Sequence, residues 1–245
     1  MTTTTPAELL PSLLSADPGR PRITCYDDLP GPTAGERVEL SAAVLDKWVA
    51  KVGNALQEEW DIGPGSRVAL RAAPHWRSVY WALGVWRIGA TLLVDGSADA
   101  DDVDLIVTDD QPPADAGAAV VYLTRASLAR TADIALAPGV VDEAAELSGY
   151  GDHLDPWETP DDDHEALVSP RLAARYLDLV TVSSQQWPGL HRGARLDLAP
   201  ASTHDLLTAV VATWSVSGSV VVHLGETDPQ VRSGRARSEG VDARL

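Results

Sequence analysis

The densest cluster of potential metal ligands in the sequence is the stretch DDDHE, residues 161–165. Its carboxylates offer the oxygen ligands that hard divalent cations prefer, and His164 would favour a softer metal. Consecutive carboxylates on a loop more often form a solvated acidic bulge, because a metal site needs ligands that converge with a fixed geometry. The sequence therefore predicts no metal site here and no bound cofactor.

Two further polar stretches end predicted β-strands. Asp109 and Asp110 end the stretch DLIVTDD, and Ser183 and Ser184 end the β-prone stretch LVTVSS. Open α/β sheets bind ligands beyond the carboxyl ends of their strands, so these four side chains are the predicted ligand-binding residues. An Asp-Asp pair before QPP is equally typical of an ordinary turn.

No catalytic residue is predicted. The nucleophile elbow G-x-S-x-G, the zinc motif H-E-x-x-H, the dinucleotide motif G-x-G-x-x-G and the P-loop are all absent from the sequence. The histidines are scattered along the chain, and an isolated histidine is most often structural. The single cysteine, Cys25, lies in a β-prone segment, where the role of a small buried hydrophobic residue is favoured over that of a nucleophile.

Apolar strands and helices alternate over residues 1–150. The predicted elements are a short amphipathic helix in PAELLPSLL, a hairpin of strands 22–26 and 36–40, strands at 67–72, 89–96, 104–110 and 118–124, and helices after Ser41 and from His75 to Ile88. The helix after Ser41 has one apolar stripe, whereas the helix from His75 is apolar nearly all round, which predicts a place between layers. Strands that are continuous apolar runs indicate an α/β fold with mostly parallel sheets covered by helices.

The acidic, proline-punctuated stretch 151–165 is the predicted connection between two lobes, residues 1–150 and 151–245. The smaller second lobe is predicted to hold a helix at 170–178, strands at 179–184 and 195–199, a helix at 203–217 and the strand SVVVHL. The tail from Gly225 is rich in Arg, Ser and Gly, so it is predicted to be poorly ordered.

Charge and composition exclude several classes of partner. The formal net charge of −17 opposes binding to nucleic acid or anionic lipid, because both need a basic surface. No apolar run approaches the ~20 residues that cross a bilayer. The N-terminus has neither the basic start nor the long apolar core of an export signal, and a single cysteine suits a reducing compartment. The expected location is the cytoplasm.

Three stretches, in this order and spacing, resemble one enzyme superfamily. They are LSAAVLDKWVAKVGNALQEEWDI, GPGSRVAL and HWRSVYWALGVWRIGATLLVDG, which lie within residues 20–110. They resemble the N-terminal subdomains of the adenylate-forming (AMP-binding) enzymes, such as the acyl-CoA synthetases. A weaker resemblance covers GARLDLAPASTHDLLTAVVATWSVSGSVVVH. The resemblance implies the fold of those subdomains and, for intact members, activation of carboxylic acids with ATP.

The sequence departs from that superfamily where the resemblance implies a phosphate loop rich in Thr, Ser and Gly and ending in Pro-Lys. Backbone amides must approach phosphates closely there, which requires glycine. Between Gly151 and Gly189 there is no glycine, and DDDHEALVSPRLAARYLD joins the flanking stretches directly. The only lysines, Lys47 and Lys51, belong to the polar face of a predicted helix. The later motifs and the C-terminal domain with its catalytic lysine have no counterparts, and members of the superfamily are about twice this length.

These departures favour a degenerate, non-catalytic member that acts as a binding or interaction protein. The alternative is an acyl or nucleotide binder, or a ligase-like enzyme, that keeps a pocket between the lobes. Sheet edges and apolar faces that the missing parts would cover predict a homodimer or another protein partner.

Overall fold

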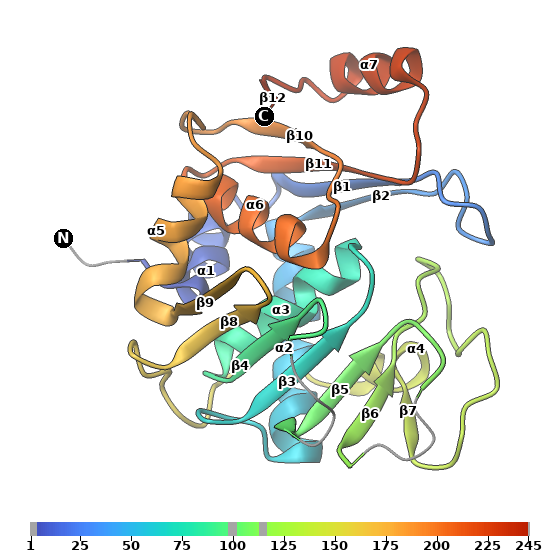
Figure 1. Ribbon diagram of the computed structural model, residues 1–245, viewed down its shortest axis with the longest axis vertical. Helices are drawn as coiled ribbons and strands as arrows, with labels where there is room; N and C mark the ends of the chain where they lie inside the picture. The colour runs from blue at the N-terminus through green and yellow to red at the C-terminus, as the bar shows by residue number, and fades with distance from the viewer. Residues whose placement is uncertain (1–3, 98–101, 113–116, 245) are drawn as a thin grey trace.

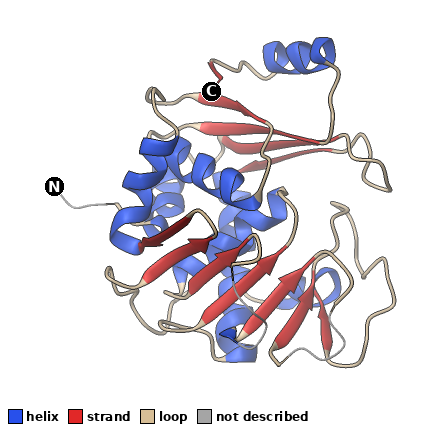
Figure 2. Cartoon of the chain, in the orientation of Figure 1, coloured by secondary structure: helices blue, strands red, loops and turns tan. Residues whose placement is uncertain are grey.

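The computed structural model describes residues 4–97, 102–112 and 117–244, which form two sheets with most of the helices packed between them (Figures 1 and 2). Helix α3 contacts strands of both sheets, and α6 contacts the smaller one. One continuous hydrophobic core joins the two sheets, from Ile23 and Val220 in one to Leu70 and Leu92 in the other. The α/β fold class predicted from the sequence is confirmed.

The smaller sheet has five strands in the order β12-β10-β11-β1-β2. Its strands are β1 (Pro21–Asp27), β2 (Arg37–Ser41), β10 (Arg195–Leu198), β11 (Ser219–Leu224) and β12 (Ala243–Arg244). All neighbours are parallel except β1 and β2, which form the predicted antiparallel hairpin.

The larger sheet has seven strands in the order β7-β6-β5-β3-β4-β8-β9. Its strands are β3 (Arg67–Arg71), β4 (Thr91–Val94), β5 (Leu105–Thr108), β6 (Ala119–Tyr122), β7 (Val140–Asp142), β8 (Glu165–Ser169) and β9 (Leu172–Arg175). They are parallel except β9, which forms a hairpin with β8.

The helices are α1 (Pro6–Ala16), α2 (Ala42–Trp60), α3 (Trp76–Arg87), α4 (Glu143–Glu146), α5 (Tyr176–Gln186), α6 (Thr203–Ser215) and α7 (Pro229–Ser238), with a 3₁₀ turn η2 (Leu147–Gly149). The Ser41 hydroxyl caps α2 by accepting a hydrogen bond from the Val44 N–H, as its sequence position predicts. Every residue of α3 from Trp76 to Trp86 is buried, which confirms the prediction that this helix lies between layers. None of the helices in the described residues is long and apolar enough to cross a membrane.

The sequence prediction is wrong for LVTVSS, which is helical in α5, and for residues 172–175, which form β9 instead of a helix. Tyr176, Leu179 and Ser183 are buried in α5 at spacings of three and four residues. One stripe of that helix is therefore covered, and α5 packs against α6. Val180 and Val182, two of the β-branched residues of this β-prone stretch, are partly buried beside this stripe.

The C-terminal tail is also more regular than its composition predicts. The Asp228 carboxylate caps α7 by accepting from the Gln230 and Val231 N–H groups. Arg235 of α7 pairs with Asp28, and Glu239 pairs with Arg195, so ion pairs hold the tail against the five-stranded sheet. Figure 1 shows α7 outside that sheet, on the side opposite α6.

The division between the sheets does not coincide with the predicted lobe boundary at residue 151. Strands β1 and β2 from the start of the chain join β10, β11 and β12, whereas β8 and β9 join the sheet of β3–β7. The chain therefore crosses between the sheets more than once. Residues 151–164 of the predicted connection carry no helix or strand, and they lie between β7 and β8, two strands of the same sheet.

Candidate functional site

A groove of about 140 Å³ lies where the β1–β2 connection meets the carboxyl ends of β5 and β6. Leu29, Pro30, Pro32 and Thr33 line it from the β1–β2 connection, and Asp109, Tyr122, Leu123, Arg125, Ala126 and Asp133 line it from the seven-stranded sheet. The groove is thus formed by segments that belong to different sheets. Ligands of open α/β sheets bind at this edge, beyond the carboxyl ends of the strands.

Asp109 directly follows β5 and lies where the strand order reverses. The chain passes from β3 to β4 on one side and then to β5 on the other, so the carboxyl ends of β3 and β5 flank a topological switch point. The Ala73 N–H, just beyond β3, lies 3.3 Å from each carboxylate oxygen of Asp109. Burial raises the pKa of Asp109, and the nearby Arg125 and the Ala73 N–H act in the opposite direction.

Arg125 is the central cation of the groove. Its guanidinium lies 3.5 Å from Asp27 and 3.9 Å from Asp109, and its Nε and Nη2 atoms are buried without a hydrogen-bond partner among the described residues. The neighbouring Thr124 hydroxyl is also buried and unpaired within those residues. Buried donors without partners are rare in folded proteins, so these groups offer hydrogen bonds that protein atoms do not use.

Asp27 anchors the other wall of the groove. Its carboxylate accepts hydrogen bonds from the Leu29 N–H at 2.9 Å and from the Thr33 hydroxyl at 2.8 Å. The β1–β2 connection thereby holds this carboxylate beside Arg125. The arrangement places one cation between two carboxylates, with guanidinium donors left over to bind an oxygen of a small ligand.

Two reactive side chain types near the groove are held in inert forms. Burial lowers the pKa of His75 well below its usual value, and the adjacent Arg125 and Arg77 lower it further, so its imidazole is neutral at physiological pH. Burial raises the pKa of Cys25 to about 12, so its thiol stays protonated. Cys25 is buried, as its sequence context predicts.

The structure brings only one of the four predicted ligand-binding residues into the groove. Asp109 lines it, whereas Asp110 is exposed and its carboxylate accepts from the Gln111 N–H in a local turn. Ser183 is buried within α5, and the Ser184 hydroxyl donates to the Val180 carbonyl of the same helix. The two serines lie on a helix because the predicted strand does not exist there.

A tight hairpin turn occupies the segment where the resemblance implies a phosphate loop. Ser169 of β8 pairs with Leu172 of β9, so only Pro170 and Arg171 connect the strands. The Ser169 hydroxyl accepts from the Arg171 and Leu172 N–H groups at 3.2 and 3.1 Å and lies 2.9 Å from His204 Nδ1. The amides of this turn are thus already occupied by a side chain.

The acidic stretch before that hairpin does not converge on one point. Asp163 pairs with Arg175 at 2.8 Å, while Asp161 accepts from the Asp163 N–H and lies 3.8 Å from His164. Within the described residues, no group of three His, Cys, Asp or Glu side chains is placed to hold a metal ion.

Comparisons with known proteins give relatives for the whole chain, although no protein-family model matches it. A protein of Mycobacterium tuberculosis (strain ATCC 25618 / H37Rv) described as a TIGR03089 family protein is 34% identical over 253 residues, which span 98% of this chain and 97% of that protein. An identity of this size over nearly the full length of both chains shows common family membership.

Solved structures share the fold at low sequence identity. An acyl-CoA synthetase from Brucella canis superposes with a TM-score of 0.77 at 16% identity, over 99% of this chain and 47% of that one. A fatty acyl CoA synthetase from Mycobacterium tuberculosis gives 0.67 at 13% identity, over 98% of this chain and 48% of that one. The N-terminal domain of FACL13 from the same organism gives 0.70 at 13% identity, over 98% of this chain and 62% of that one. This chain spans about half the length of the two synthetases, shares their fold, and belongs to the TIGR03089 family.

Proposed function

We propose that this protein is a non-catalytic binding or interaction protein built on the acyl-CoA synthetase fold. The observation that carries the proposal is the two-residue turn, Pro170 and Arg171, between β8 and β9. A loop that binds ATP phosphates needs several backbone N–H groups pointing at one anion. The amides that follow Ser169 instead donate to its own hydroxyl.

The charges around the hairpin support the same proposal. Transfer of a phosphoryl or adenylyl group needs positioned cations or a metal ion to stabilise the developing charge. The Arg171 guanidinium donates to the Ser202 hydroxyl and to Asp205, each at 2.8 Å, so it is already engaged. Lys51 donates to the carbonyls of Ser148 and Tyr150 and pairs with Asp152, on a different part of the molecule.

A second candidate function is binding of a small ligand in the groove at Asp109 and Arg125. The unpaired guanidinium donors of Arg125 favour it, because they would satisfy an oxygen-bearing group that reaches into the groove. Its volume of about 140 Å³ is below the 300–1,000 Å³ typical of sites that enclose a whole drug-sized ligand. The groove would therefore hold one small polar group.

Thermal unfolding in the presence of ATP and magnesium tests the main proposal. Ligand at 100 times its dissociation constant stabilises a protein by ~2.7 kcal/mol, which raises the melting temperature of a chain of this size by roughly 5 to 10 °C. We expect no shift at millimolar ATP and no exchange of pyrophosphate into ATP with a panel of carboxylic acids, whereas a complete acyl-CoA synthetase assayed alongside gives both signals. A saturable shift of several degrees, or carboxylate-dependent exchange, would overturn the non-catalytic proposal.

A further inference from the structure

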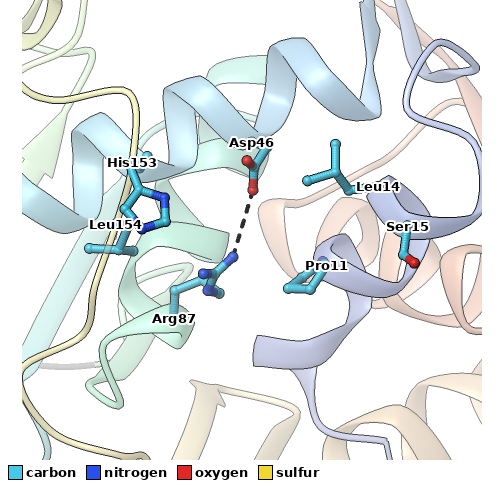
Figure 3. Close-up of a pocket in the computed structure, with 8 residues that line it drawn as sticks. Pro11, Leu14, Ser15, Asp46, Arg87, His153 and Leu154 are labelled. Carbon is cyan, nitrogen blue, oxygen red and sulfur yellow. Dashed lines mark ion pairs between the residues drawn. The ribbon is translucent and has the colours of Figure 1, made fainter.

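A second pocket, of about 330 Å³, lies between α1, α2, the carboxyl end of α3 and residues 153–154 (Figure 3). Helix α3 begins just beyond the carboxyl end of β3 and ends before β4 starts. Arg87, at the end of α3, therefore lies toward the opposite end of the helix from the groove that contains Asp109. The two pockets share no lining residue.

Arg87 brings a guanidinium with unused donors to this pocket. Its side chain is only 19% exposed, and its one charged neighbour among the described residues is Asp46, with 3.7 Å between Nη1 and Oδ1. That distance is too long for a hydrogen bond, and Arg87 makes none with the described part of the chain. A guanidinium carries five N–H donors and stays protonated in proteins, so the Arg87 donors that line the pocket are available to a ligand there.

Asp46 contributes the opposite charge to the pocket. Its carboxylate, on α2, accepts no hydrogen bond from the described residues and makes only the long contact with Arg87. Figure 3 shows the two side chains reaching toward each other across the pocket, one from α2 and one from α3. The pocket thus presents a cation and an anion side by side, and both have free capacity for hydrogen bonds.

Apolar side chains flank this charged pair. Pro11 and Leu14 of α1 lie on one side in Figure 3, and Leu154 lies on the other with His153. Ala50 of α2 adds to the apolar walls, and Ser15 of α1 adds a hydroxyl to the lining. A hydrocarbon group would lose contact with water between these walls, which is favourable in proportion to the area buried.

We propose that this pocket binds a small zwitterion with an aliphatic body, namely an α-amino acid with a branched apolar side chain. Its carboxylate accepts from Arg87 and its ammonium group donates to Asp46, since the two groups sit on one carbon atom and the two protein charges lie 3.7 Å apart. The aliphatic side chain lies between Leu14 and Leu154. A volume of about 330 Å³ is at the lower end of the range for ligand sites and suits a ligand of this size.

Isothermal titration calorimetry with three related compounds tests the ligand class. L-Leucine has both charged groups, 4-methylpentanoate lacks the ammonium group, and 3-methylbutylamine lacks the carboxylate. We expect saturable binding of L-leucine and about tenfold or greater weakening for each of the other two, because each leaves one protein charge without its partner. No saturable binding of L-leucine up to ~10 mM, or equal binding of 4-methylpentanoate, would overturn the proposal.

Variants of Arg87 and Asp46, with one control variant, assign the binding to this pocket. Arg87→Gln is expected to weaken L-leucine binding about tenfold or more, and Asp46→Asn to weaken L-leucine but not 4-methylpentanoate. Arg244→Gln makes the same change at an exposed arginine on β12 and should leave binding unchanged. If Arg87→Gln does not fold, Arg87→Lys keeps the charge without the planar fork and should bind more weakly than the wild type. Unchanged L-leucine binding in folded Arg87 and Asp46 variants would overturn the assignment.

Discussion

Two arginines near the same end of the seven-stranded sheet have opposite surroundings. The Arg77 side chain is 4% exposed, and its guanidinium donates to the Tyr80 hydroxyl at 2.9 Å, to Glu143 at 3.3 Å and to the Ala126 carbonyl at 2.8 Å. Arg125 is 24% exposed, and within the described part of the chain it makes only the long ion pairs with Asp27 and Asp109. The first guanidinium is largely satisfied by the protein, whereas the second retains unused donors.

The difference separates a structural ion cluster from one that can accept a ligand. Tyr80 donates to Glu143 and accepts from Arg77, so the three side chains form one hydrogen-bonded cluster inside the core. Burial raises the pKa of Glu143, and the Arg77 charge and the Tyr80 hydroxyl oppose that increase. The Nε atom of Arg77 is also buried without a partner among the described residues, but both terminal nitrogens of Arg77 donate hydrogen bonds, whereas Arg125 leaves Nε and Nη2 without partners there. We therefore expect that mutating the partners of Arg77 lowers the stability of the protein, whereas mutating Arg125 impairs ligand binding.

The largest effect is expected for Glu143→Ala. Removing one partner leaves the Arg77 charge buried and uncompensated, which typically costs ~3 to 5 kcal/mol in the free energy of unfolding. Urea unfolding followed by circular dichroism measures the loss. Glu146→Ala, at an exposed residue of the same helix, is the matched control and should change stability by less than ~0.5 kcal/mol. A loss below about 1 kcal/mol for Glu143→Ala would show that the Arg77 charge does not depend on Glu143 for compensation.

A smaller loss is expected for Gly84→Ala, which tests how tightly α3 is enclosed. A Cβ atom at Gly84 would lie 2.8 Å from the Cβ of Val52 on α2, closer than real contacts allow. Overpacking of this kind typically costs ~1 to 3 kcal/mol. Gly63→Ala is the control, because nothing lies within 4 Å of a Cβ there and the backbone is not in the left-handed region. Equal melting temperatures for the two variants would contradict the close approach of α2 and α3.

The enclosed region is also the part that the sequence predicts best. The stripe of the helix after Ser41 and the nearly uniform apolarity of the helix from His75 depend on local periodicity alone. The structure confirms both helices: α2 begins directly after Ser41, and α3 begins and ends within one residue of the predicted range 75–88. By contrast, α7 has a polar sequence, and the partners that order it, such as Asp28 and Arg195, are distant in the chain. Composition could not reveal those contacts, although Asp-Pro at 228–229 is a recognisable helix start.

The groove was only partly predictable for the same reason. Asp109 was predictable because ligands of open α/β sheets bind beyond the carboxyl ends of the strands, and Asp109 does line the groove. Arg125 carries no local signal, because its meaning depends on Asp27, which is 98 positions earlier and lies in the other sheet. The serines of LVTVSS do not line this groove, because they lie on α5 and not at the end of a strand.

Arg125→Gln is expected to change stability by about 1 kcal/mol or less. Its ion pairs are long, and Asp27 keeps its hydrogen bonds from the Leu29 N–H and the Thr33 hydroxyl. Urea unfolding in parallel with Glu143→Ala makes the comparison direct. A loss as large as that of Glu143→Ala would mean that Arg125 is a structural residue, and the groove would then lose its main support as a ligand site.

The smallest expected effect concerns a third arginine, Arg235, which is the hydrogen-bond partner of Asp28, the residue next to Asp27. Its guanidinium donates to both carboxylate oxygens of Asp28, at 2.5 and 2.9 Å. The hydrogen bonds from Arg235 lower the pKa of Asp28 to about 2, and the Thr227 hydroxyl contributes in the same direction.

Because the pKa of Asp28 is lower in the folded state than in the unfolded state, the ionised carboxylate stabilises the fold at pH values above the ordinary pKa of 3.8. This contribution is lost as the pH falls toward 2. Because Asp28 is near the surface, solvent screening limits the effect to below about 1 kcal/mol. Carbon NMR of the Asp28 carboxyl should show a midpoint below the ordinary value near 3.8, and Asp28→Asn should remove the corresponding pH dependence of the unfolding free energy. A midpoint at the ordinary value would show that Arg235 does not hold α7 in place. Asp28, whose two carboxylate oxygens both accept hydrogen bonds from Arg235, would then not differ from Asp27, whose arginine partner lies 3.5 Å away.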